Sequence, residues 1–172
     1  MKNLTLILMS IVFLSFSLKT GNEEWKTHET KYYKIEYPST WDLNLSGQMN
    51  TKFMIFAPTE SASDKFKENV NLISEATKAE QTLDTYIKTS IEQIKKVLSG
   101  VKIIEDKRIK NNNDEYHKLV YQVKQGAFNL NILQNIRIVK NKSYVLTFTA
   151  EKSKYKSYLP TAEKIMDPFK LK

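Results

Sequence analysis

Apolar residues recur at every second position in several short stretches of the chain, and this pattern predicts β-strands. Residues 33–37 are the first such stretch, because aromatic and β-branched side chains alternate there with Lys34 and Glu36, as is typical of a half-buried strand. Pro38 has no N–H for the ladder and ends the strand. Trp41 follows at the turn, and we interpret it as a core anchor, since large aromatic side chains are mostly buried.

Six further stretches have strand patterns between turn residues, and they cover residues 52–57, 70–73, 101–109, 115–123, 128–138 and 144–150. Short links join the last four, which predicts an antiparallel meander. The alternation is cleanest in residues 128–138, where asparagine and arginine residues occupy the positions between the apolar ones. We therefore expect this strand to have one buried face and one solvated face.

Two stretches have the three- and four-residue spacing of an amphipathic helix. The first covers residues 82–98, with Thr82 as its N-cap and Gly100 as a left-handed stop. The second lies near the end of the chain. Because proline is poorly tolerated inside a helix but accepted in its first turn, we expect this second helix to begin near Pro160.

The predicted order of elements is three strands, a helix, four strands and a second helix. This order predicts an α+β fold in which a central antiparallel β-sheet is flanked by helices. A cystatin-like or nuclear-transport-factor-like fold also wraps a meander around one helix, but the three strands before the first helix argue against it. The length of 172 residues fits one globular domain with a sizeable core.

The N-terminal residues 1–17 have the pattern of a secretory signal peptide, because Lys2 precedes an apolar run that ends at Ser17. The run is short for a membrane span, which needs about 20 residues. We assign residues 18–30 to a flexible lead-in and residues 31–172 to the folded domain. The alternative is an uncleaved N-terminal anchor. In both cases we expect the domain to lie outside the cytoplasm, either in the periplasm or secreted.

The chain contains no cysteine, which excludes a disulfide framework, a thiolate metal site and a thiol nucleophile. Its net charge is +8, a balance that permits anionic partners without identifying one. The lysines are spread along the whole chain, whereas a nucleic-acid footprint is usually clustered. We interpret the basic residues as a solvated surface and expect no nucleic-acid partner.

The sequence contains no pattern from which a catalytic, cofactor-binding or metal-ligating residue can be assigned, and we expect no cofactor. The two histidines, His28 and His117, are far apart and have no companion at ligand spacing. Acidic residues such as Asp64 and Glu68 do not form a calcium-loop pattern, so we interpret them as surface residues. The Gly-x-Ser-x-Gly motif is absent and there are only four glycines, so a hydrolase is the least favoured function.

Five segments taken in order resemble the PsbP-like family, which includes bacterial envelope proteins of the DcrB type. They are residues 33–41, 69–73, 83–86, 116–121 and 141–150. The resemblance implies the Mog1/PsbP fold, a central antiparallel sheet between helices in an α/β/α sandwich. It also implies a non-enzymatic accessory or binding role. Many members are lipoproteins, and the absence of cysteine departs from that pattern.

Three functions remain open from the sequence. The first is an exported accessory protein that binds a protein or an envelope component through a sheet or loop surface. The second is a carrier of a small apolar or lipid-like ligand between sheet and helix, which nine tyrosines and eight phenylalanines permit. The third is an enzyme. We expect the first, as a monomer that meets a membrane only if its N-terminal segment is retained. A Mog1-like role on a nuclear GTPase conflicts with a signal peptide.

Overall fold

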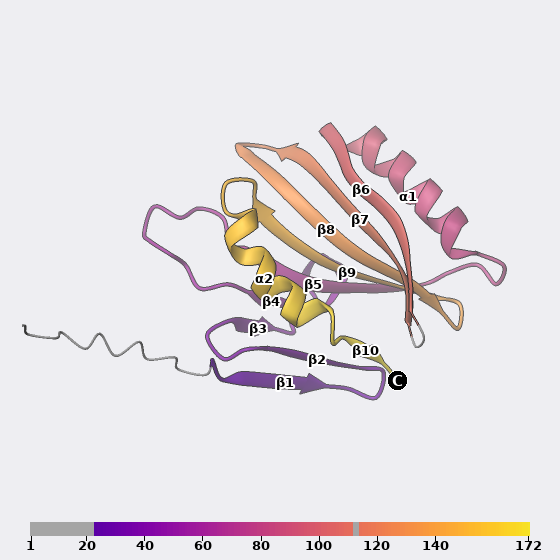
Figure 1. Cartoon of the computed structure of the whole chain (residues 1–172), viewed down its shortest axis with the longest axis horizontal. Helices are drawn as coiled ribbons and strands as arrows, with labels where there is room; N and C mark the ends of the chain where they lie inside the picture. The colour runs from indigo at the N-terminus through magenta and orange to yellow at the C-terminus, as the bar shows by residue number, and fades with distance from the viewer. Residues whose placement is uncertain (1–22, 112–113) are drawn as a thin grey trace, which may run out of the picture.

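The computed structural model of the protein describes residues 23–111 and 114–172 (Figure 1). The predicted signal peptide and the first residues of the predicted lead-in lie outside these ranges. Within them the chain forms β1 (Trp25–Glu29), β2 (Tyr33–Pro38), β3 (Asp42–Asn44), a short 3₁₀ helix η1 (Gln48–Asn50), β4 (Thr51–Phe56), β5 (Asn69–Ala76), α1 (Leu83–Val97), β6 (Ser99–Asn111), β7 (Asp114–Gln125), β8 (Phe128–Val139), β9 (Lys142–Glu151), α2 (Tyr155–Met166) and β10 (Lys170–Leu171).

The strands form two sheets in which all neighbours are antiparallel. The main sheet has the order β3-β4-β5-β9-β8-β7-β6, and the small sheet has the order β1-β2-β10. The turn between β8 and β9 contains Lys140 and Asn141 with φ angles of 50° and 57°, the left-handed conformation that a tight two-residue hairpin requires. In Figure 1 the small sheet lies below the curved main sheet, and the C-terminus lies beside the β1–β2 hairpin.

The two faces of the main sheet are covered by different elements, and each cover defines a core. On one face, α1 packs Leu83 and Ile87 against β6, β7 and β8. On the opposite face, α2 and the small sheet cover β4, β5 and β9, where Phe53, Leu72 and Phe148 are fully buried. Helices on opposite faces of a central antiparallel sheet make the predicted α/β/α sandwich, which is confirmed.

All seven predicted strands are present in the structure, and the strands that the sequence did not predict are the short β1, β3 and β10. The interpretation of Trp41 as a core anchor is also confirmed. Its side chain is 5% exposed and meets the ring of Tyr158 on α2 edge to face, with 6.0 Å between ring centroids. This contact fixes the corner after β2 against the second helix.

The predicted flexible lead-in is wrong for Trp25–Glu29, because these residues form β1 and pair with β2 along their whole length. Exposed residues such as Lys26 and Thr27 interrupt the apolar alternation of this segment. Its strand conformation therefore depends on the pairing with β2 rather than on a local pattern. Every strand pair and both cores described above lie within residues 25–171.

The second helix begins at Tyr155 rather than near Pro160. Pro160 lies inside α2 at an exposed position, and it removes the helical partner of the Lys156 carbonyl, which is also on the exposed side. The loss is tolerated because Tyr155 and Met166, on the other side of the helix, are buried in the core. Packing of the apolar side therefore extends the helix to a point before the proline.

The second face of β8 is solvated at Asn129 and in part at Asn131, but its later half is buried, in contrast to the prediction. Asn135 and Arg137 are only 3% and 4% exposed, because α2 and the following C-terminal residues cover this side of the strand. The Arg137 guanidinium donates two hydrogen bonds to Asp114, at 2.9 and 2.6 Å, and lies 4.5 Å from the centroid of the Tyr116 ring. A paired and hydrogen-bonded arginine can be buried in this way.

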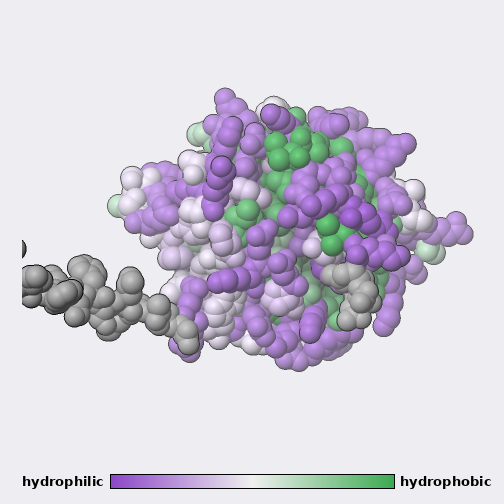
Figure 2. Space-filling model, viewed as in Figure 1, coloured by the Kyte–Doolittle hydropathy of each residue, from purple (hydrophilic) through white to green (hydrophobic). Residues whose placement is uncertain are grey.

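The molecular surface is mainly hydrophilic on the face seen in Figure 2, with smaller apolar patches between the charged side chains. The large hydrophobic side chains that remain exposed in the described ranges are Tyr32, Leu45, Met49, Val97, Ile104 and Val139. Neither of the two described helices combines the length and the apolar character that crossing a membrane requires.

Candidate functional site

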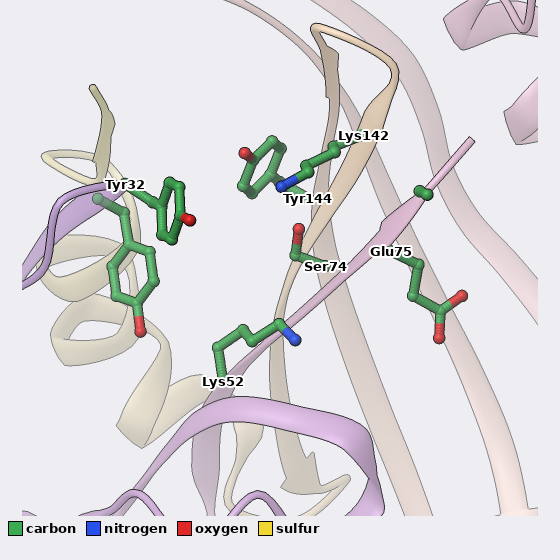
Figure 3. A pocket seen from close by; sticks show the side chains of 8 residues that line it. Tyr32, Lys52, Ser74, Glu75, Lys142 and Tyr144 are labelled. Carbon is green, nitrogen blue, oxygen red and sulfur yellow. The ribbon is translucent and has the colours of Figure 1, made fainter. Parts of the chain in front are cut away.

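A pocket of about 340 Å³ opens where the β1–β2 hairpin meets one end of the main sheet. We call it the tyrosine pocket, and its lining consists of Tyr32, Tyr33, Lys52, Ser74, Glu75, Ala76, Lys142 and Tyr144 (Figure 3). Small-molecule sites usually have volumes of roughly 300 to 1,000 Å³ and mainly apolar walls with a few polar groups. The tyrosine pocket fits this description at the lower end of the range.

The floor of the tyrosine pocket is formed by β5 and β9. In their antiparallel register Ser74 lies opposite Tyr144, and Ala76 lies opposite Lys142. These residues continue the face of the sheet on which Leu72 is buried in the core. Because Ser74 and Ala76 have small side chains, they leave the space that larger residues fill further along the same strands.

The opposite wall of the pocket is aromatic and comes from the start of β2. Tyr33 is 6% exposed, and its ring packs 5.6 Å from the ring of Phe53 and 6.0 Å from that of Phe169, measured between centroids. Tyr32 is half exposed. The Thr30 hydroxyl accepts hydrogen bonds from the backbone N–H groups of both tyrosines. These contacts fix the inner ring and leave the outer ring open to solvent.

Lysine ammonium groups lie around this aromatic wall. The Nζ atoms of Lys31 and Lys142 are 4.9 and 5.2 Å from the centroid of the Tyr32 ring. A hydrogen bond to Lys31 and the charge of that lysine lower the pKa of Tyr32, with a smaller effect of Lys142. Lys52 approaches from the β4 side (Figure 3). Across the described residues, neither Lys52 nor Lys142 has a carboxylate oxygen within 4.0 Å.

The single carboxylate of the lining, Glu75, is engaged outside the aromatic wall. It accepts a hydrogen bond of 2.8 Å from Asn50 Nδ2, and Figure 3 shows it on the other side of β5 from Tyr144. Two lysines and three tyrosines therefore face the pocket without an opposing carboxylate. This arrangement suits a ligand that combines an anionic group with an apolar body.

The polar groups of the tyrosine pocket are three phenols, two ammonium groups, the Ser74 hydroxyl and the Glu75 carboxylate. Within the described part of the chain, no base is hydrogen-bonded to Ser74. Burial raises the pKa of Tyr33, so its phenol stays neutral near pH 7. In residues 23–111 and 114–172 no three histidine, aspartate or glutamate side chains are grouped so that they could hold a metal ion.

The two histidines lie in different sheets, and neither is among the residues that line the pocket. The ring of His28, on β1, is 5.9 Å from the ring of Tyr33. His117 is buried on β7, with Nε2 2.6 Å from Asp106 Oδ1, whereas its Nδ1 has no hydrogen-bond partner in the described residues. Among the described residues, neither histidine has a hydrogen bond to a serine or threonine hydroxyl.

The interpretation of Asp64 and Glu68 as surface residues is wrong. Their side chains are 4% and 1% exposed, and the Nζ atom of Lys154 lies 2.9 and 3.9 Å from their carboxylate oxygens. Glu60 is a third partner at 3.2 Å. The hydrogen bond to Asp64 contributes most to a raised pKa of Lys154. We call these four residues the Lys154 cluster, and it joins the loop before β5 to the start of α2.

The sequence did not indicate any residue of the tyrosine pocket as functional. Tyr32 stands directly before the first predicted strand, Lys142 lies in the predicted turn before the last one, and Tyr144 begins that strand. The sequence signal for the pocket is the presence of tyrosine and lysine at both of these strand ends. This signal does not identify a site on its own, because only the fold brings the start of β2 against β5 and β9.

The fold defines the class of this protein as an α+β protein with the Mog1/PsbP fold. Cyanobacterial PsbP from Synechocystis superimposes with a TM-score of 0.65 at 12% sequence identity, over 90% of this chain and 96% of that chain. LpqN of Mycobacterium tuberculosis, which is involved in cell envelope biogenesis, has a TM-score of 0.61 at 12% identity, over 87% and 91% of the two chains.

The Ran-binding protein Mog1p of Saccharomyces cerevisiae shares the same architecture, with a TM-score of 0.57 at 8% identity, over 87% of this chain and 96% of that chain. At these identities the likeness concerns the fold, and at that level it confirms the predicted resemblance to PsbP-like proteins. No protein-family model matches the chain, and no curated protein matches it in sequence.

Proposed function

We propose that this protein is an exported, non-enzymatic accessory protein that binds an envelope component through the tyrosine pocket. The observation that carries the proposal is the pocket itself, in which Lys52 and Lys142 accompany an aromatic wall without a carboxylate partner in the described residues. The ligand class is an amphipathic anion, that is, a phosphate or carboxylate group attached to a short apolar body. An ammonium group pairs with the anionic group, and the tyrosine rings cover the apolar body.

Export and an accessory role have separate support. The apolar run in residues 1–17 has the pattern of a signal peptide, so we place the protein in the periplasm or outside the cell. Cyanobacterial PsbP and LpqN, the latter involved in cell envelope biogenesis, have the same fold. The pocket lacks a nucleophile paired with a base in the described residues, which supports binding rather than catalysis.

A carrier that encloses a small apolar ligand between sheet and helix has less support. The tyrosine pocket lies between β5, β9 and the β1–β2 hairpin, and neither helix contributes to its lining. Both helices instead pack their buried side chains into the two cores. A volume of about 340 Å³ suits a small ligand, or one end of a larger ligand, that stays partly exposed.

A titration of residues 23–172 with hexyl phosphate, hexanol and inorganic phosphate tests the proposal, followed by isothermal calorimetry or by NMR shifts of the tyrosine rings. This part of the chain contains every described strand pair and both cores. Hexyl phosphate should bind more tightly than either of the other two compounds, because only it presents both groups. Lys142→Gln should weaken the binding of hexyl phosphate about fivefold, because losing one such interaction costs roughly 1 kcal/mol of binding free energy.

Lys110 provides the matched control, because it is an exposed lysine on β6 outside the pocket lining. Lys110→Gln should leave the affinity for hexyl phosphate unchanged. Equal losses in both variants would mean that the net charge of the protein, and not the pocket, attracts the ligand. Equal binding of hexanol and hexyl phosphate would contradict the assignment of an anionic ligand.

A further inference from the structure

Among the described residues, most of the exposed large hydrophobic side chains lie at the end of the fold that contains the tyrosine pocket. Met49 and Leu45, in the connection from β3 to β4, are 71% and 54% exposed. Tyr32 before β2 is 49% exposed, and Val139 at the end of β8 is 37% exposed. Single exposed apolar side chains are common on proteins, whereas several at one end of a molecule indicate an interaction surface.

Hydrogen bonds and ring contacts join the loops that carry these side chains. Asn50, beside Met49, donates to Glu75 at the end of β5. The N–H of Thr77, just after β5, donates to the carbonyl of Asn141 in the β8–β9 turn at 2.9 Å. Lys142, which follows that turn, lies over the ring of Tyr32. The three connections therefore form one continuous surface around the mouth of the pocket.

The backbone has a costly conformation at Met49. Its φ angle is 52°, and that of Asn50 is 61°. A side chain other than glycine is disfavoured in this left-handed region, and such strain is frequent at functional sites. Met49 combines this conformation with high exposure, so packing in the described structure does not compensate for it.

The charge of the surface is positive. Lys31, Lys52, Lys140 and Lys142 are all exposed around the apolar side chains. The carboxylates on the adjoining strand ends already have partners. Glu29 is paired with Lys172, and Glu75 accepts a hydrogen bond from Asn50. A second copy of the chain would bring lysines against lysines, which opposes self-association through this surface.

We propose that this surface docks on a lipid bilayer that contains anionic phospholipid. The side chains of Leu45, Met49 and Val139 enter the interfacial layer, the lysines pair with phosphate groups, and the tyrosine pocket holds one headgroup. The inference rests on the proposed function, because a phospholipid headgroup with its attached glycerol is an amphipathic anion. Apolar contact combined with lysines near an anionic surface is the established physical basis of such peripheral binding.

Flotation of residues 23–172 with lipid vesicles tests the docking surface, and starting at residue 23 removes the apolar N-terminal run as a source of binding. The protein should float with vesicles of phosphatidylcholine and phosphatidylglycerol but not with pure phosphatidylcholine, and salt should weaken the binding. The double variant Leu45→Ser/Met49→Ser and the double variant Lys52→Gln/Lys142→Gln should each bind these vesicles about tenfold more weakly.

Val97 and Lys124 provide the matched controls. Val97 is 77% exposed at the end of α1, and Lys124 is an exposed lysine of β7 that pairs with Ser99, so both lie at the end of the main sheet opposite the docking surface. Val97→Ser and Lys124→Gln should bind vesicles within about twofold of the unchanged protein. Circular dichroism of each variant shows whether it is folded. Failure to float with phosphatidylglycerol vesicles, or equal losses in the controls, would overturn the proposal.

The two proposals can fail separately. The Leu45→Ser/Met49→Ser variant leaves the pocket lining intact and should bind hexyl phosphate with unchanged affinity. If hexyl phosphate binds but vesicles do not, the docking surface is wrong and the pocket proposal stands. If vesicles bind through Met49 but hexyl phosphate does not bind, the pocket proposal fails. If the unchanged protein did not bind vesicles but formed a concentration-dependent dimer, and the Leu45→Ser/Met49→Ser variant did not dimerise, the surface would be assigned to a second copy of the chain instead.

Discussion

The strands β4, β5 and β9 have a lysine site at each end, and the two sites differ in what surrounds the ammonium group. At one end, Lys154 lies 2.9 Å from Asp64, 3.2 Å from Glu60 and 3.9 Å from Glu68. At the other end, Lys142 lies over the ring of Tyr32, and no carboxylate oxygen of the described residues is within 4.0 Å of it.

This difference separates a structural role of lysine from a binding role in the same sheet. An ammonium group that neutralises buried carboxylates holds its loop in place, and its removal leaves unpaired buried charge. An ammonium group beside an aromatic ring, without a carboxylate, keeps its capacity to pair with an external anion. We therefore expect the same substitution to lower stability at one end and ligand affinity at the other.

The largest effect is expected for Lys154→Met. The substitution leaves the carboxylates of Asp64 and Glu68, which are 4% and 1% exposed, without their cation. It should lower the free energy of unfolding by about 2 kcal/mol, which is less than for a fully buried pair because Lys154 is one-fifth exposed. Urea unfolding followed by circular dichroism measures this change. Lys152→Met, at an exposed lysine nearby, is the control and should change stability by less than about 0.5 kcal/mol.

A smaller, pH-dependent effect is expected for Glu68→Gln. Burial raises the pKa of Glu68 above its ordinary value of 4.5, against the opposing effects of hydrogen bonds and Lys154. The folded state then binds more protons than the unfolded state in the window above 4.5, so this group lowers stability as the pH rises through that window. The glutamine does not titrate, and it can still accept from the Glu151 N–H.

Glu68→Gln should therefore become more stable relative to the unchanged protein as the pH rises from 4.5 towards neutrality. Urea unfolding of both proteins at a series of pH values gives this difference directly. Glu80→Gln, at an exposed glutamate in the connection to α1, is the control and should not reproduce the gain. A difference that falls with rising pH would show that the attraction of Lys154 for Glu68 exceeds the cost of burial.

The sequence predicted the main sheet and both helices but not the two lysine sites, for a physical reason. Alternation along a strand and the three- and four-residue spacing of a helix are local consequences of having one buried side. The burial of Glu68 depends on Lys154, which is far along the chain, and the pocket depends on the approach of Tyr32 to Lys142. Within each of these two pairs, one residue leaves no trace in the apolar and polar pattern of the sequence around the other.

The same limit explains the errors in the fold prediction. The short strand β1 is paired along its whole length, but its stability comes from β2 and not from its own polar sequence. The alternation in residues 128–138 predicts a solvated Arg137, but pairing with Asp114 removes the cost of burying its charge. The poor tolerance of proline inside a helix predicts a start near Pro160, but the burial of Tyr155 extends the helix to a point before it. In each case contacts with residues distant in the sequence change the conformation or the burial that the local pattern predicts.

The smallest effect on stability is expected for Lys142→Met, which is the same chemical change as Lys154→Met at the opposite end of β9. Lys142 is exposed and loses only its contact with the Tyr32 ring, so the free energy of unfolding should change by less than about 0.5 kcal/mol. Its affinity for hexyl phosphate should nevertheless fall about fivefold, because an ammonium group that could pair with the phosphate is gone. Urea unfolding and calorimetry on the same preparation measure both quantities. If Lys142→Met unfolded as readily as Lys154→Met and bound hexyl phosphate normally, the tyrosine pocket would be a structural site, and the contrast between the two ends of the sheet would disappear.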